Sequence, residues 1–269
     1  MTLDVQTHNR VAALCASSAK LLVAYLMPEF PIPNATLPAL FALEESGVNV
    51  IELGMPHSDP LADGRTIQDA AQLAIKNGAT LKRILSLVKT ARQQGFNAAL
   101  ILMGYVNPIL RYGTTAFLND AKAVGVDGFI VPDLPPEEAE AFRRDVARRN
   151  LSMTFLISPV SSPERIQTID ALSTDFSYAL AVNATTGTAK LSSEKIFDEL
   201  EAYLARVRAN VKKKFVVGFG IQTRAQIEWM LERADGAVVG SAYLRAIASA
   251  QTPEAVAERT KAFWRTLQA

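Results

Sequence analysis

The 269-residue sequence has few of the residues on which several classes of site depend. Its single cysteine, Cys15, excludes an internal disulfide bond and fits a reducing compartment. Its two histidines, His8 and His57, are too few for a multi-histidine metal site, and a Ser-His-Asp triad would need one of them. We therefore expect carboxylates, without a metal ion, to transfer protons in any enzymatic reaction.

Excess charge and long apolar segments are also lacking. The 28 Lys and Arg against 27 Asp and Glu leave a formal charge of +1, which argues against a nucleic-acid partner, because phosphate neutralisation needs clustered basic side chains. The most apolar segment, 98–103, is far shorter than the roughly 20 residues of a membrane helix. The first residues lack the basic and then apolar pattern of a signal peptide. We expect a cytoplasmic protein with no membrane partner.

Short apolar segments recur along the whole chain. They are continuously apolar rather than alternating, which is typical of parallel strands buried on both faces. The eight segments are 21–26, 48–54, 98–105, 128–133, 152–158, 176–182, 214–220 and 236–242. Stretches with helical spacing separate them, at about 35–46, 66–94, 114–124, 137–149, 163–172, 193–211, 223–233 and 253–267.

Eight strand–helix units without a linker predict an α/β fold, a single (β/α)8 TIM barrel. We expect one domain over 1–269, with a helical lead at 1–19. A doubly wound open sheet is the alternative, but it normally has a glycine-rich turn after the first strand, and 26–33 contains no glycine. In a barrel the catalytic groups lie where strands end and in the loops that follow.

Glu52 is the first candidate catalytic residue. It lies in an apolar strand between Ile51 and Leu53, where burial raises a carboxyl pKa toward the range useful for proton transfer. A structural glutamate paired with a basic residue of a neighbouring strand is the alternative. Since no other predicted strand has a basic residue in its interior, we favour the catalytic interpretation.

Asp63 is the second candidate. It lies in the loop that follows Glu52, where Pro56 and Pro60 stiffen the backbone and can hold an acid over the barrel mouth. Asp63-Gly64 could equally be a turn or a helix cap before Thr66. Asp63 alone leaves the two interpretations open.

Glycines at the ends of the last two predicted strands suggest a phosphate site. The segments GFGIQT (218–223) and VVGSA (238–242) end where barrels commonly bind phosphate through backbone N–H groups. Gly218, Gly220 and Gly240 allow close backbone approach, and the Ser241 hydroxyl can donate. Tight turns alone would also explain these glycines.

Other features narrow the chemistry. A Schiff-base aldolase needs a lysine at a strand end, and only Lys190, in the glycine- and threonine-rich loop 183–193, could reach the mouth. Tyr178, Phe129, Met103 and Tyr105 could line an apolar pocket, or be ordinary core. A phosphate-binding barrel with two carboxylates indicates acid–base cleavage or isomerisation of a phosphorylated substrate.

The segment IELGMPHSDPLADGRTIQ (51–68) closely resembles the signature of tryptophan synthase alpha subunits. Further matching segments follow in register, so the resemblance extends from about residue 20 to the C-terminus. They are LMGYVNPI (102–109), GFIVPDLPPEE (128–138), FLISPVSSPERI (155–166), GFGI (218–221) and VVGSA (238–242).

The resemblance implies a lyase that cleaves indole-3-glycerol phosphate to indole and glyceraldehyde 3-phosphate, with Glu52 and Asp63 as its catalytic pair. It implies no cofactor in this chain, and a pyridoxal-phosphate-dependent beta subunit as partner in an alpha2-beta2 tetramer. The implied phosphate ligands are Gly187, Gly218, Gly220, Gly240 and Ser241. The residues implied around the indole are Tyr25, Tyr105, Tyr178 and Phe129, with Thr186 as the partner of Asp63.

The sequence departs from the family pattern in three loops. Val182-Asn183-Ala184 replaces the usual start of the sixth loop, His57 and Arg65 stand in the second loop, and MPEFP (27–31) lacks the usual Gly-Asp-Pro. No catalytic group is lost. The departures leave two alternatives open: a stand-alone lyase that releases free indole, and a weakly active subunit that binds and activates a beta partner.

Overall fold

The computed structural model describes residues 9–181, 193–218 and 220–268. Its strands form one parallel sheet in the order β5-β4-β3-β2-β1-β9-β8-β7-β6. They are β1 (Leu21–Leu26), β2 (Val50–Met55), β3 (Ala99–Gly104), β4 (Gly128–Ile130), β5 (Ser152–Thr154), β6 (Leu156–Ile157), β7 (Phe176–Leu180), β8 (Lys214–Gly218) and β9 (Gly236–Val239).

The sheet closes on itself through its fifth predicted strand. Phe155 interrupts that strand, so its halves, β5 and β6, are the two ends of the sheet order although they are consecutive in the chain. The Phe155 carbonyl accepts a hydrogen bond from the Tyr178 amide of β7 at 3.1 Å. The predicted (β/α)8 barrel is confirmed, because the eight apolar segments supply its strands in sequence order.

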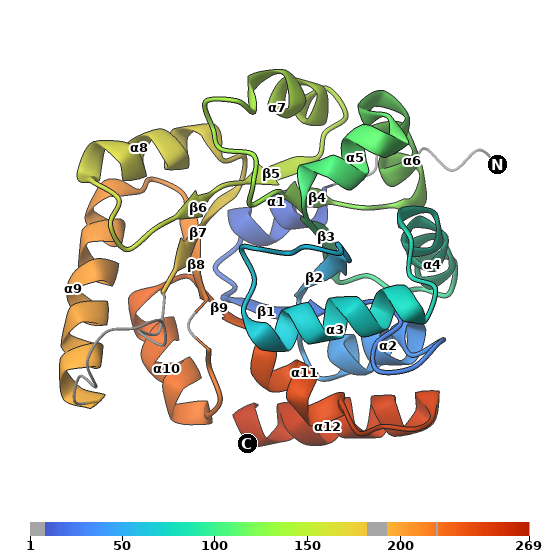
Figure 1. Ribbon diagram of the computed structural model, residues 1–269. Coiled ribbons are helices and arrows are strands. Elements are labelled where there is room, and N and C mark those ends of the chain that lie inside the picture. The colour runs from blue at the N-terminus through green and yellow to red at the C-terminus, as the bar shows by residue number, and fades with distance from the viewer. Residues whose placement is uncertain (1–8, 182–192, 219, 269) are drawn as a thin grey trace.

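Helices surround the strands (Figure 1). They are α1 (Arg10–Ala16), α2 (Thr36–Glu45), α3 (Arg65–Lys76), α4 (Leu81–Gln93), α5 (Val106–Tyr112), α6 (Thr114–Val124), α7 (Glu140–Ala147), α8 (Pro163–Leu172), α9 (Ser193–Asn210), α10 (Arg224–Arg233), α11 (Ser241–Ile247) and α12 (Pro253–Gln268). None of the helices in the described ranges is long and apolar enough to cross a membrane.

Two details of the helix prediction were wrong. The stretch 66–94 is two helices, α3 and α4, because Gly78 takes a φ of +87° between them and the Thr80 side chain caps α4. The short helices α5 and α11 follow directly on strand ends and were not predicted.

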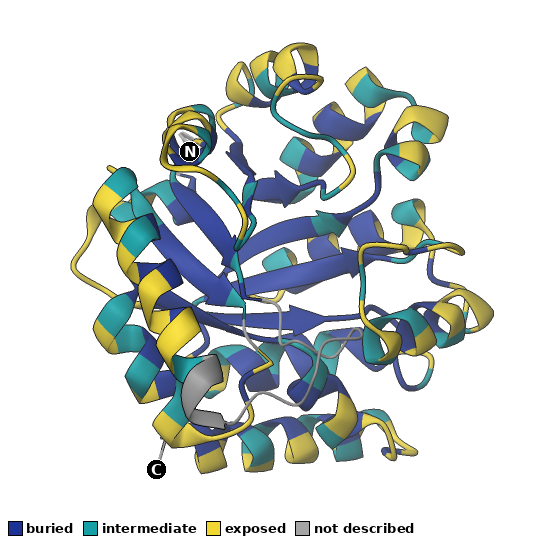
Figure 2. Cartoon of the chain, turned by 60° about the vertical axis from the view of Figure 1, so that its left-hand side comes forward, coloured by how far each residue is buried: buried dark blue, intermediate teal, exposed yellow. Residues whose placement is uncertain are grey.

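The strands are buried on both faces, as Figure 2 shows. Because side chains alternate along a strand, one set faces the barrel interior and the other faces the helices. Val23, Val50 and Ile101 belong to the interior cluster, while Ala24, Ile51 and Leu102 belong to the larger core beneath the helices. Val11 of α1 joins the interior cluster, so α1 covers the amino-terminal end of the barrel.

A buried ion pair at this end supports a stability prediction. The Asp127 carboxylate, 3% exposed, accepts hydrogen bonds from Arg92 Nη2 at 2.8 Å, Arg10 Nη1 at 3.1 Å and the Leu100 amide at 2.9 Å. Asp127→Ala would leave the largely buried Arg92 unpaired, which costs about 3–5 kcal/mol. We expect the lower end of this range in urea unfolding, because Arg92 keeps its bonds to three backbone carbonyls.

The matched control is Arg224→Ala. Arg224 pairs with Glu228 on α10, and both side chains are half exposed, at 50% and 56%. An exposed pair contributes about 1 kcal/mol or less. Equal losses of stability in the two variants would contradict the role assigned to Asp127.

Candidate active site

Glu52 lies inside the barrel, two residues further along β2 than the interior residue Val50. It is 1% exposed, and its Oε1 has no hydrogen-bond partner. No ion pair joins it to a cation among the described residues. Burial alone raises the pKa of Glu52 to about 8, so the carboxyl is protonated at neutral pH and can act as an acid.

Two tyrosines face the interior near Glu52. Tyr25 of β1 is its register partner on the neighbouring strand, and Tyr178 lies on β7. Each ring extends over a glycine: a Cβ at Gly54 would lie 2.6 Å from the Tyr25 hydroxyl oxygen, and one at Gly218 would clash with the hydroxyl oxygen of Tyr178. These glycines make room for the two phenols at the carboxyl ends of the strands.

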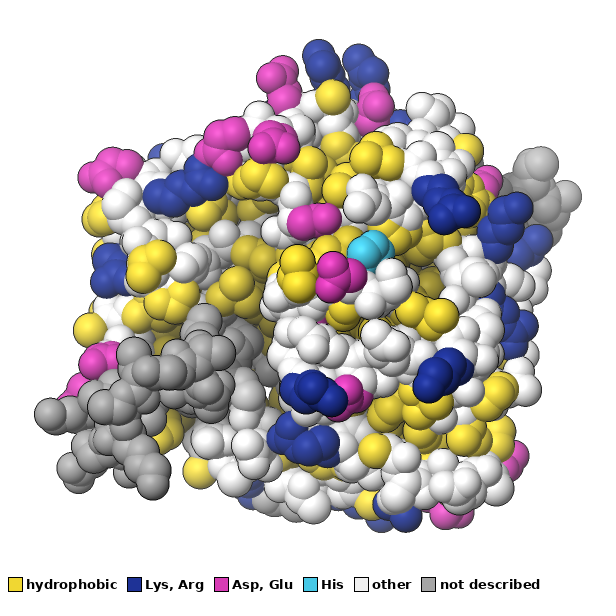
Figure 3. Space-filling view, viewed as in Figure 1, with side chains coloured by type: hydrophobic (Ala, Val, Ile, Leu, Met, Phe, Trp, Pro, Cys, Tyr) yellow, Lys and Arg dark blue, Asp and Glu magenta, His cyan; other side chains and the backbone are white. Residues whose placement is uncertain are grey.

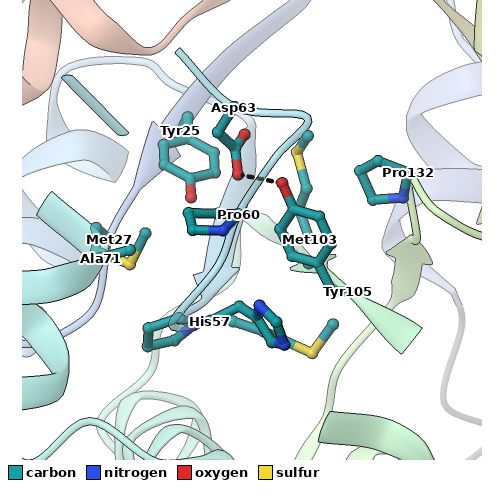
Figure 4. Close-up of a pocket in the computed structure, with 12 residues that line it drawn as sticks. Tyr25, Met27, His57, Pro60, Asp63, Ala71, Met103, Tyr105 and Pro132 are labelled. Atoms are coloured by element: carbon teal, nitrogen blue, oxygen red, sulfur yellow. Dashed lines mark hydrogen bonds between the residues drawn. The ribbon is translucent and has the colours of Figure 1, made fainter. Parts of the chain in front are cut away.

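Asp63 lies in the loop between β2 and α3. The side-chain amide of Gln68 in α3 donates a hydrogen bond to the Asp63 carbonyl at 2.9 Å, which anchors the loop to this helix. The Tyr105 hydroxyl donates to Asp63 Oδ2 at 2.9 Å (Figure 4). It also accepts from the Ala62 amide at 2.9 Å. Burial raises the pKa of Asp63, while the hydrogen bond from Tyr105 lowers it. This bond fixes the position of the carboxylate.

His57 supports the same loop, a contact that the sequence did not predict. Its ring packs against Tyr105 with centroids 5.2 Å apart, and its Nδ1 accepts from the Asp59 amide at 3.1 Å. The two contacts join the start of the loop to the residue that holds Asp63.

Mostly apolar side chains line a small pocket between this loop and the ends of β1, β2 and β3. Met103 was a candidate from the sequence, and its interior position after Ile101 places it here. The residues that line the pocket are Tyr25, Met27, Met55, Pro56, His57, Pro60, Asp63, Ala71, Met103, Gly104, Tyr105 and Pro132.

The glycines expected to bind phosphate lie at the ends of two adjacent strands. Gly218 ends β8 and is the register partner of Val238 on β9. Gly220 has a φ of +56°, a conformation that favours glycine. Gly240 directly precedes Ser241, the first residue of α11.

Phe129 is not part of the site, so this expectation was wrong. Its ring lies 5.4 Å from that of Phe117 of α6 and 6.0 Å from that of Phe142 of α7, centroid to centroid, on the helix side of β4. Strand alternation is the reason, since the neighbouring Ile130 faces the interior. Gly187 and Thr186 lie outside the described residues.

The fold and the site define a (β/α)8-barrel enzyme with a protonated acid and a fixed carboxylate at one end of the barrel. The family model for the tryptophan synthase alpha chain matches residues 11–269. The chain belongs to this family, and it is therefore a lyase of tryptophan biosynthesis.

Curated relatives and solved structures agree. The tryptophan synthase alpha chain of Prosthecochloris aestuarii is 56% identical over 97% of this chain and 99% of that relative. That of Pelodictyon phaeoclathratiforme is 55% identical over 97% and 100%. A structure of the tryptophan synthase complex from Pyrococcus furiosus has a TM-score of 0.82 at 35% identity, covering 92% of this chain and 97% of that one.

Proposed function

We propose that the chain cleaves indole-3-glycerol phosphate with Glu52 as the general acid and base. The observation that carries this proposal is a buried carboxyl, protonated at neutral pH, with an unpaired oxygen at the carboxyl end of the barrel. A buried acid of this kind suits protonation of a ring carbon. Apolar side chains line the nearby pocket, and an indole ring would pack against such a surface.

In this mechanism Glu52 gives its proton to indole carbon C3. The bond between C3 and the adjacent glycerol carbon then breaks, and its electrons restore the aromatic indole. The hydroxyl group on that glycerol carbon becomes the aldehyde as its proton passes to the Glu52 carboxylate. The acid is regenerated, and no cofactor is needed for the proton balance.

Asp63 stabilises the positive charge that develops on the indole N–H after C3 is protonated. The hydrogen bond from Tyr105 holds its carboxylate in place before the substrate binds, so little reorganisation is needed during the reaction. From the family resemblance we also propose Thr186 as a partner of Asp63.

We propose that the phosphate of the substrate binds at the ends of β8 and β9. Their adjacency supports a shared site, and the positive φ of Gly220 gives a backbone shape that larger residues rarely adopt. Binding at this end would orient the glycerol chain toward Glu52. The proposed ligands are Gly187, Gly218, Gly220, Gly240 and Ser241.

The pKa of Glu52 leads to a pH prediction. Because ionised Glu52 cannot protonate C3, kcat/KM should fall above about pH 8, approaching tenfold for each further pH unit. The phosphate of the substrate titrates near pH 6, about two units lower, so rates measured from pH 7 to 10 isolate Glu52. A profile that stays flat to pH 10 would contradict a protonated Glu52 as the starting state.

We also propose a tryptophan synthase beta subunit as partner. A structural relative is described as the tryptophan synthase alpha2-beta2 complex of Pyrococcus furiosus. Leu61, in the loop after β2, is 81% exposed, and Leu110, in α5 after β3, is 59% exposed. Figure 3 shows hydrophobic side chains exposed among charged ones on this face. We expect the partner to contact these exposed leucines. A cytoplasmic location belongs to the same proposal, supported by the single cysteine.

One experiment tests both the reaction and the partner. Indole formed from indole-3-glycerol phosphate is measured for the purified chain with and without a beta subunit. We expect cleavage that rises when beta is added. Fast cleavage unaffected by beta would contradict the partnership and favour a stand-alone lyase, whereas a stable complex without cleavage would indicate a binding subunit.

A further inference from the structure

The hydroxyl group of Tyr25 has no role in the mechanism above. Tyr25 is 5% exposed and lines the pocket. Its hydroxyl makes no hydrogen bond to any other described residue. The hydroxyls of Tyr203 and Tyr243, two other buried tyrosines, pair with the Ile157 carbonyl and with Thr260. A buried phenol that faces a pocket without a partner is available to a ligand.

The placement of this hydroxyl depends on two strands. Tyr25 and Glu52 are register partners on β1 and β2, and both face the barrel interior. The phenol oxygen occupies the space above Gly54, where a Cβ would lie 2.6 Å from it. Gly54 is two residues beyond Glu52, so the hydroxyl stands at the carboxyl end of the barrel, beside the acid.

The electrostatic surroundings keep this hydroxyl protonated. Burial raises the pKa of Tyr25 well above its usual value, and the charges of Asp63 and Glu52 raise it further. Within the pocket the group is a hydrogen-bond donor at every pH at which the enzyme would work.

The reaction benefits from a hydrogen-bond donor at the glycerol oxygen. Tyr178 also faces the interior near Glu52, but among the described residues it is Tyr25 that lines the pocket. The glycerol oxygen gains negative charge while its proton passes to Glu52, until the carbonyl double bond has formed. The described residues that line the pocket include no lysine or arginine, and the proton of Tyr105 is already donated to Asp63.

We propose that the Tyr25 hydroxyl donates a hydrogen bond to the glycerol oxygen from which Glu52 removes the proton. This inference rests on the proposed function and adds a catalytic residue to it. Tyr25 then has two roles: its ring contributes to the wall of the indole pocket, and its oxygen contacts the reacting end of the glycerol chain.

The test is Tyr25→Phe, which removes one oxygen and keeps the ring. We expect kcat/KM for indole-3-glycerol phosphate to fall about 10- to 100-fold, less than the 10²–10³-fold lost with a donor to a full oxyanion. Affinity for indole-3-propyl phosphate, which lacks both glycerol hydroxyls, should change less than twofold. Equal losses for the substrate and this analogue would overturn the proposal, because they would indicate a displaced ring.

Tyr243→Phe is the matched control, since it removes a buried hydroxyl that bonds Thr260. It should lower stability without lowering kcat/KM. Unchanged kinetics in Tyr25→Phe, with an active wild-type chain, would overturn this inference alone. A wild-type chain that forms no indole would overturn the proposed function and the inference with it.

Discussion

Glu52→Gln is expected to lower kcat for indole formation by about 10²–10⁴-fold, the usual contribution of a general acid–base group. Glutamine has nearly the same shape as the protonated glutamic acid, but it can neither give a proton to carbon C3 nor accept one from the glycerol hydroxyl. Indole release from indole-3-glycerol phosphate measures the effect. More than a tenth of the wild-type rate would contradict the proposed role of Glu52.

The stability of Glu52→Gln, measured as a function of pH, is the control that shows whether this variant is folded. The pKa of Glu52 is raised in the folded chain, so from about pH 4.5 to 8 the unfolded chain ionises while the folded chain stays protonated. The free energy of unfolding of the wild type therefore falls as the pH rises through that range. Glu52→Gln lacks the titration, so its stability relative to wild type should increase toward pH 8.

Glu52 could be proposed from the sequence because it is an acidic residue near the end of a continuously apolar strand. Once the segment 48–54 is recognised as a buried parallel strand, the residues near its end are candidates for the barrel mouth. Which of two neighbours faces inward requires the register of the strand. At β4 the sequence did not supply it, and Phe129 was assigned to the pocket although Ile130 faces inward.

Contacts between distant loops were harder to predict. The hydrogen bond of Tyr105 to Asp63 joins residues 42 positions apart, on the end of β3 and in the loop after β2. It depends on the fold of the Pro56–Gly64 loop, which local sequence preferences leave open. His57 is a similar case, because its role appears only when its ring is seen against that of Tyr105.

Asp63→Asn is expected to lower kcat by about 10²–10³-fold, the range found when one electrostatic contact to a developing charge is removed. Asparagine keeps the shape and can still accept the hydrogen bond from Tyr105, but it has no charge to stabilise the protonated indole ring. Indole release measures the loss. A variant within threefold of wild type would contradict the electrostatic role of Asp63.

Tyr105→Phe separates the charge of Asp63 from its position. The hydrogen bond from Tyr105 lowers the pKa of Asp63, so losing it raises that pKa. Since only ionised Asp63 stabilises the ring, the acidic limb of the kcat profile should move to higher pH, while the rate on the plateau falls less than in Asp63→Asn. A purely structural role for Tyr105 would lower the plateau and leave the acidic limb where it is. The direction of this shift therefore decides whether Tyr105 acts on catalysis through the carboxylate of Asp63.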